Sequence, residues 1–137
     1  MKFLPPEDYQ RRNIVLFQDL KQRLASNLPK ARIEHVGASA VPGALSKGDL
    51  DVFVGVPPEE LEESIEVIES LGFEVKRDTL RSSELCMLEL NTSEADVAVQ
   101  LVANNSKFEF FIDFRDALLG SAELLSSYNT LKESCSG

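Results

Sequence analysis

Asp49 and Asp51 are the residues of this sequence whose types and spacing most directly suggest chemistry. They stand two positions apart at the start of the apolar run DLDVFVGV, residues 49–56. On a β-strand, residues two apart project from the same face, so the two carboxylates would lie close together. Two like charges at that distance repel unless a cation lies between them. The pair therefore predicts a metal site, and the open alternative is a strand that begins at the water-facing surface.

The segment before this pair, ASAVPGALSKG at residues 38–48, is rich in Gly and small residues. This composition predicts a loop with one helical turn. Backbone N–H groups of such loops can approach phosphate oxygens, while carboxylates hold metals that bridge the same phosphates. His35 is the single histidine, which cannot supply a multi-histidine zinc site. The expected cofactor is therefore Mg²⁺, or Mn²⁺ in its place, held by oxygen ligands.

Composition narrows the class of protein. The chain has 137 residues, 43% of them hydrophobic and 27% charged, which predicts one soluble domain over residues 1–137. No apolar run approaches a membrane span, and MKFLPPEDYQRR lacks the apolar core of a signal peptide, so a cytoplasmic location is expected. The net charge of -9 argues against nucleic acid as a partner. A small ligand or a protein is the expected partner, and a homo-oligomer remains open.

Hydrophobic spacing predicts the elements that would position the two aspartates. Apolar residues at helical spacing predict an opening helix and a second helix that starts at a proline pair, while alternating apolar residues predict strands. The last two predicted strands form a hairpin through TSE. The expected order is a helix at 8–28, strands at 31–37 and 49–56, a helix at 57–72, strands at 73–78, 84–91 and 95–102, and two helices from 107 onward. This is an α+β fold: a mixed sheet of about five strands, with helices mainly on one face.

The loop and the carboxylate pair resemble the signature of the nucleotidyltransferase superfamily, whose fold DNA polymerase beta shares. That signature is a Gly-Ser pair, about ten residues, and then D-x-D at the start of a strand. Gly37 and Ala38 stand at this spacing from Asp49, with Ala38 where the superfamily usually has Ser and Ser39 one place later. The resemblance implies a nucleoside triphosphate as partner. It implies nucleotide binding by Gly37, Ala38, Ser39 and Lys47, and metal binding and catalysis by Asp49 and Asp51.

The resemblance also implies a third carboxylate on a later strand, as metal ligand or general base. Asp96 is the first candidate, because it shares a strand face with Ala98 and Gln100. Glu94 and Glu89 are the reserves. The open alternative is that Asp96 simply marks the surface end of the hairpin.

A closer resemblance is to the GrpB family of bacterial proteins, a largely uncharacterised branch of this superfamily. Its hallmark runs approximately I-E-H-V-G-S-T-[AS]-V-P-G-L-x-x-K-P-x-x-D-I, and this chain has IEHVGASAVPGALSKGDLDV from Ile33. The segment FRDALLGSAELLSSYNTLK similarly resembles a second conserved family segment. Two departures stand out: Asp49 replaces an apolar residue of the family, and Ala98 and Gln100 replace the histidines of a frequent H-L-H.

Three functions follow as alternatives. The first is a magnesium-dependent nucleotidyltransferase that acts on a small-molecule or protein hydroxyl. The second is a non-catalytic nucleotide-binding or accessory domain of the same fold, which the family resemblance links to coenzyme A metabolism. The third is an interaction protein whose acidic helix, within residues 58–71, docks a partner.

Overall fold

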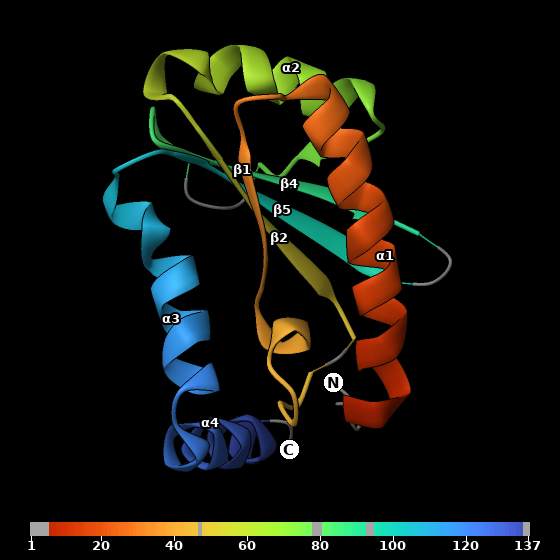
Figure 1. Ribbon diagram of the computed structural model, residues 1–137, viewed down its shortest axis with the longest axis vertical. Helices are drawn as coiled ribbons and strands as arrows, with labels where there is room; N and C mark the ends of the chain where they lie inside the picture. The colour runs from red at the N-terminus through yellow and green to blue at the C-terminus, as the bar shows by residue number, and fades with distance from the viewer. Residues whose placement is uncertain (1–5, 47, 78–80, 93–94, 136–137) are drawn as a thin grey trace.

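The computed structural model describes residues 6–46, 48–77, 81–92 and 95–135 (Figure 1). Four α-helices and five strands make up these residues, together with three short 3-10 helices. The elements are α1 (Pro6–Asn27), β1 (Arg32–Val36), η1 (Ala38–Ala40), β2 (Leu50–Val56), η2 (Pro58–Glu60), α2 (Leu61–Ser70), β3 (Glu74–Val75), β4 (Leu85–Asn91), β5 (Asp96–Ala103), η3 (Lys107–Glu109), α3 (Phe110–Leu119) and α4 (Ala122–Cys135).

The strands form one five-stranded sheet in the order β1-β2-β5-β4-β3. β2 and β5 run parallel to each other, and the other neighbouring pairs are antiparallel. β2 and β5 are the second and third strands and carry almost continuous buried runs, as expected of strands covered on both faces. The predicted α+β fold with a mixed sheet of about five strands is confirmed.

Helices α1 and α2 pack on one face of this sheet, in line with the expectation of helices mainly on one face, and α3 covers part of the other. Leu24 of α1 and Ile68 of α2 pack with Val52 and Val99 in the larger core cluster. On the opposite face, Ile112 of α3 joins a smaller cluster with strand residues, among them Phe53 and Val102. Figure 1 shows α1 and α3 on opposite sides of the strands, with α4 crossing at the end where the loop between β1 and β2 lies. The short α3 covers only part of its face and leaves room for polar side chains there.

Several boundaries differ from the predicted ones. β3 contains only Glu74–Val75 within the predicted strand 73–78, and the polar Lys76 and Arg77 that follow offer nothing to bury. The predicted helix 57–72 divides into η2 and α2. The helical turn predicted in the loop is η1. The hairpin is confirmed by the pairing of Asn91 with Asp96, although part of its turn lies outside the described residues.

The apolar stripe of α1 also differs in one position. Leu20 and Leu24 are buried as the spacing predicts, but Ile14 is 47% exposed. Tyr9 and Asn13 are fully buried in its place, both 0% exposed. The polar residue Asn13 thus occupies a buried position of this helix. Among the described residues, no helix is long and apolar enough to cross a membrane.

Candidate functional site

Asp51 lies on β2 and Asp49 lies one residue before the strand begins. Both side chains are half-buried. In the parallel register Asp51 stands opposite Ala98 of β5, and Leu50 stands opposite Val97. The start of β2 and the start of β5 therefore meet at one end of the sheet, and this end carries the acidic residues.

Gly37 packs directly against Asp51. Its backbone has φ 74 and ψ -172, a conformation that is essentially restricted to glycine. A Cβ added at this position would overlap Asp51 Oδ2 and would lie 2.9 Å from both Cβ and Cγ of that side chain. The glycine of the predicted phosphate loop thus also makes room for the carboxylate of β2. Val36, just before it, pairs with Asp51 across β1 and β2.

Side chains of α1 fix the backbone just before Asp49. Asn13 Nδ2 donates to Gly48 O at 3.0 Å and to Asp49 O at 3.2 Å. Arg12 Nη2 donates to the same Gly48 O at 2.8 Å. The fully buried Asn13 therefore holds Asp49 outside the regular strand. In the sequence, Asn13 could have been noticed as a polar residue on the apolar stripe of a helix. Our sequence prediction did not identify it as a site residue.

The rest of the loop is held from two directions. Tyr9 donates its hydroxyl to Ala44 O at 2.7 Å, so α1 fixes the middle of the loop as well as its end. Asn129 of α4 accepts from the N–H of Leu45 at 2.9 Å and donates to Gly43 O at 2.9 Å. The path of the backbone leading to Asp49 is therefore determined by the first and last helices, which are separated in the sequence by about a hundred residues.

Ser39 faces inward. Its side chain is 3% exposed, and its Oγ lies 2.7 Å from His35 Nε2. The His35 ring stacks on Phe17 of α1 with the centroids 4.9 Å apart. The buried hydroxyl of Ser39 therefore serves the packing of the loop. Lys47 lies outside the described residues.

His35 makes the stability of the protein depend on pH. Burial, reinforced by the nearby positive charge of Arg115, lowers the pKa of His35 from its ordinary 6.5 to about 4. As pH falls below 6.5, the unfolded chain takes up a proton before the folded one does. We expect the stability that neutral His35 contributes to the folded protein to be complete above pH 6.5 and to be lost as pH falls towards 4. The loss in the free energy of unfolding should be about 2 kcal/mol after discounting for solvent screening.

Urea unfolding of the wild type and of His35→Gln between pH 7 and pH 4 measures this loss. Acidic residues titrate in both proteins, so the difference between the two curves isolates the histidine. The wild-type protein should lose more stability over this range than the variant. Parallel curves would contradict the assignment.

Asp96 and Glu89 lie close to Asp49. All three line a hollow of about 180 Å³, together with Lys76, Asn91, Val97 and Ala98. Asp51 does not line this hollow. Within the described residues, no group of three or more His, Cys, Asp or Glu side chains is placed to hold a metal ion. The structure thus gathers Asp49, Asp96 and Glu89 around one space without closing them into a cluster, while Glu94 falls outside the described residues.

Gln100 contacts Asp51 directly. Its Nε2 donates to Asp51 Oδ1 at 3.3 Å, and the residue is only 4% exposed. Its Oε1 is buried and finds no donor among the described residues. The carboxylate acceptor fixes which end of the amide faces Asp51, because the reverse orientation would set two oxygens against each other. Beside it on β5, Ala98 leaves open the space between Asp51 and Glu89, the residues paired with it on either side.

Arg115 of α3 connects the second conserved segment to this end of the sheet. Its guanidinium pairs with Asp116 at 2.9 Å and with Glu34 of β1 at 2.8 Å. It also donates to the carbonyl of His35 at 3.0 Å. Arg115 has 15% of its side chain exposed, so it acts as a structural tie between α3 and β1.

Residues 7–137 match the family described as GrpB protein. The chain belongs to the GrpB family. A UPF0157 protein of Vibrio cholerae serotype O1 is 50% identical over 137 residues, which are 100% of this chain and 72% of that protein. The crystal structure of the conserved protein GrpB from Enterococcus faecalis superposes with a TM-score of 0.80 at 22% identity, covering 98% of this chain and 82% of that one. The predicted family is confirmed.

More distant structures share the fold of this GrpB family member. A cytoplasmic RNA terminal U-transferase superposes with a TM-score of 0.56 at 20% identity, covering 80% of this chain and 32% of that one. The Cid1 poly(U) polymerase, in a structure with Mg and 3'-dATP bound, gives a TM-score of 0.57 at 19% identity, covering 80% and 35%. These likenesses establish a nucleotidyltransferase-like fold.

Proposed function

We propose that this chain is a magnesium-dependent nucleotidyltransferase, which moves a nucleotidyl group from a nucleoside triphosphate to the hydroxyl of a small molecule or a protein. The observation that carries the proposal is the position of Asp49 and Asp51 at the start of β2, beside the Gly37 turn, in a nucleotidyltransferase-like fold. Structures of similar fold support it, because Cid1 is described with Mg and 3'-dATP and with a UTP analogue.

The residues present fit magnesium. Mg²⁺ in phosphate sites is bound by one or two carboxylates together with substrate phosphates and waters, so it does not require a third protein acid. Asp49 and Asp51 would provide those carboxylates. The ion, when bound, supplies neutralisation of the negative charge on the phosphates. Gln100 would hold the Asp51 carboxylate in one orientation through its 3.3 Å hydrogen bond.

The other site residues take roles in this proposal. Backbone N–H groups of Gly37, Ala38 and Ser39 would cradle the phosphates, and Lys47 would contact them as a point charge. The acceptor hydroxyl oxygen would attack the α-phosphorus, the bond to the bridging oxygen would break, and pyrophosphate would leave. Asp96 would complete the metal ligands or accept the proton of that hydroxyl.

A second candidate function is nucleotide binding without transfer, as an accessory domain linked to coenzyme A metabolism. Its support is that no three acids among the described residues are placed to hold a metal, and that Ala98 faces Asp51 on the neighbouring strand. In this function Asp96 would not act as a base, while Asp49 and Asp51 would still hold magnesium and phosphates.

A thermal-shift screen of ATP, GTP, CTP and UTP, each with Mg²⁺ or Mn²⁺, tests binding. A ligand at about 100 times its Kd adds roughly 2.7 kcal/mol, which should raise Tm by roughly 10 °C. The same nucleotides without metal serve as the control. Absence of any metal-dependent shift with all four would remove the support for both functions.

Incubation of the bound nucleotide, labelled at its α-phosphate, with a cell extract then separates the two candidates. Transfer moves the label to an acceptor and releases pyrophosphate. Binding without release of pyrophosphate would favour the accessory domain.

A further inference from the structure

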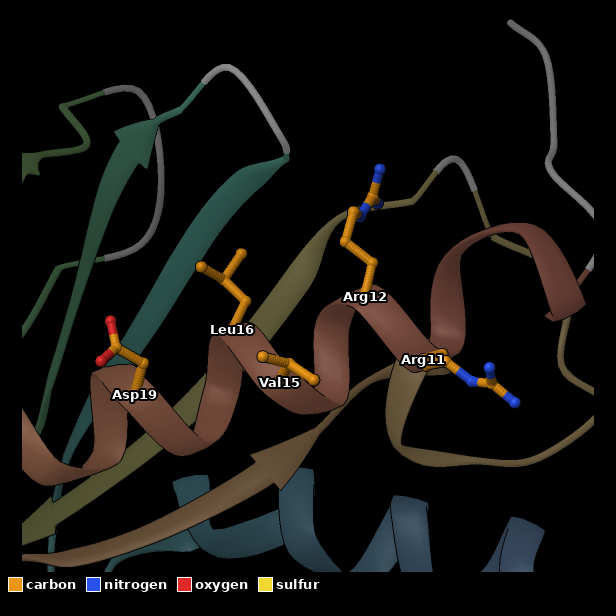
Figure 2. A pocket seen from close by; sticks show the side chains of 5 residues that line it. All are labelled: Arg11, Arg12, Val15, Leu16 and Asp19. Atoms are coloured by element: carbon orange, nitrogen blue, oxygen red, sulfur yellow. The ribbon is translucent and has the colours of Figure 1, made fainter.

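A second hollow, larger than the one beside Asp49, lies along α1. It has a volume of about 630 Å³ and is lined by Arg11, Arg12, Val15, Leu16 and Asp19. This is within the usual range of small-molecule sites, about 300–1,000 Å³. Figure 2 shows Arg12, Leu16 and Asp19 projecting from one side of the helix, with Val15 between them and Arg11 on the adjoining side.

The lining combines an apolar floor with charges at its two ends. Positions 11, 15 and 19 and positions 12, 16 and 19 follow the three- and four-residue spacing of one helix surface. Val15 is 63% exposed, so this apolar side chain is not used by the core. The two arginines stand at one end, and Asp19 stands at the other, roughly 12 Å further along the axis at 1.5 Å per residue.

The charges at both ends remain available. Neither Arg11 nor Asp19 makes a hydrogen bond or an ion pair with another described residue. Arg12 donates to Gly48 O and to Asn13 Oδ1, which uses two of the five N–H groups of its guanidinium. The guanidinium of Arg11 is thus presented to solvent on a chain whose net charge is -9, while Arg12 projects from the adjoining side of the helix and bonds to Gly48 O.

We propose that this hollow binds a small amphipathic oxyanion. Its phosphate or carboxylate head pairs with Arg11, since the planar guanidinium matches either group through two parallel hydrogen bonds. Its apolar body lies on Val15 and Leu16. Asp19 repels a second negative charge at the far end, so the site selects ligands with one anionic end. The proposal does not depend on nucleotide binding, because Arg11, Val15 and Asp19 are not residues of the proposed nucleotide site. Arg12 does contact the backbone beside that site, through its hydrogen bond to Gly48 O.

Titration of the ¹⁵N-labelled protein with hexyl phosphate, without metal or nucleotide, tests this site by NMR. We expect the amide signals of residues 11–19 to move. Arg11→Gln should weaken binding about fivefold, and Val15→Glu should abolish it. Ile14→Glu is the matched control, because Ile14 is exposed on the same helix but does not line the hollow. This variant should bind as the wild type does.

Three related ligands separate the contributions of head, body and far end. Inorganic phosphate lacks the apolar body, and hexanol lacks the anionic head. Hexane-1,6-diyl bisphosphate places a second anion near Asp19. Each of the three should bind at least fivefold more weakly than hexyl phosphate. Asp19→Asn should restore binding of the bisphosphate. Another, apolar hollow lies between α3 and α4 and is lined among others by Leu118, Tyr128 and Leu131. Signal changes centred there, or elsewhere outside residues 11–19, would overturn the proposal. Equal affinity of Val15→Glu and Ile14→Glu would also overturn it.

Discussion

Gly37→Ala should destabilise the protein by about 2–6 kcal/mol, the sum of a backbone cost and an overlap. Two costs combine at this position. The backbone conformation, φ 74 and ψ -172, is one that alanine adopts only with strain of about 1–3 kcal/mol. The new Cβ would also overlap Asp51 Oδ2 and lie 2.9 Å from its Cγ, and such overpacking costs about 1–3 kcal/mol. Chemical unfolding of the wild type and the variant measures the difference.

Gly43→Ala provides the matched control. Gly43 has φ 88, so alanine is strained there too, but the nearest atom to an added Cβ is Leu125 Cδ2 at an ordinary 3.5 Å. The difference between the two variants therefore reports the overlap with Asp51. Asp51→Ala should recover part of the loss in Gly37→Ala, because it removes the atoms that overlap. Equal destabilisation of Gly37→Ala and Gly43→Ala would show that the contact with Asp51 has no energetic consequence.

The sequence predicted the framework of this protein well where one periodicity dominates. The strands predicted at 49–56 and 95–102 are present as β2 and β5, and the structure pairs them in parallel. Their parallel pairing follows from the order of the elements in space, which local spacing does not contain. For the same reason the sequence did not indicate which helix packs on the second face, since the apolar pattern of a helix does not identify the face on which it packs.

The candidate site was predicted only in its local parts. Asp49, Asp51 and the Gly37 turn could be found because their spacing along the chain is characteristic. Asn13 and Gln100 could not be found in this way, because each acts through a contact far away in sequence. The inward direction of Ser39 depends on the ring of His35, which the backbone of β1 presents to it. Hydrogen bonds between distant segments thus determine the side-chain directions in the site, which the local spacing of residues does not specify.

Asp51→Asn should weaken metal-dependent nucleotide binding by at least about 100-fold, or about 2.8 kcal/mol. The substitution removes one negative charge from the proposed metal ligands but keeps the shape of the side chain. Gln100 can still donate to the side-chain amide oxygen of the variant, so the fold and the loop should be preserved. Calorimetric titration with the nucleotide identified by the thermal-shift screen measures the loss.

Asp113→Asn is the control for net charge, because it removes the same charge from an exposed position on α3. It should bind nucleotide as the wild type does. Asp96→Asn tests the third carboxylate: as a general base its loss would leave binding intact and stop transfer, whereas as a metal ligand its loss would weaken binding. Since Asp96 shares a hollow with Asp49 and Asp51 does not line it, we expect the first of these results. Unchanged binding in Asp51→Asn would contradict the assignment of Asp51 as a metal ligand, whatever the result at Asp96.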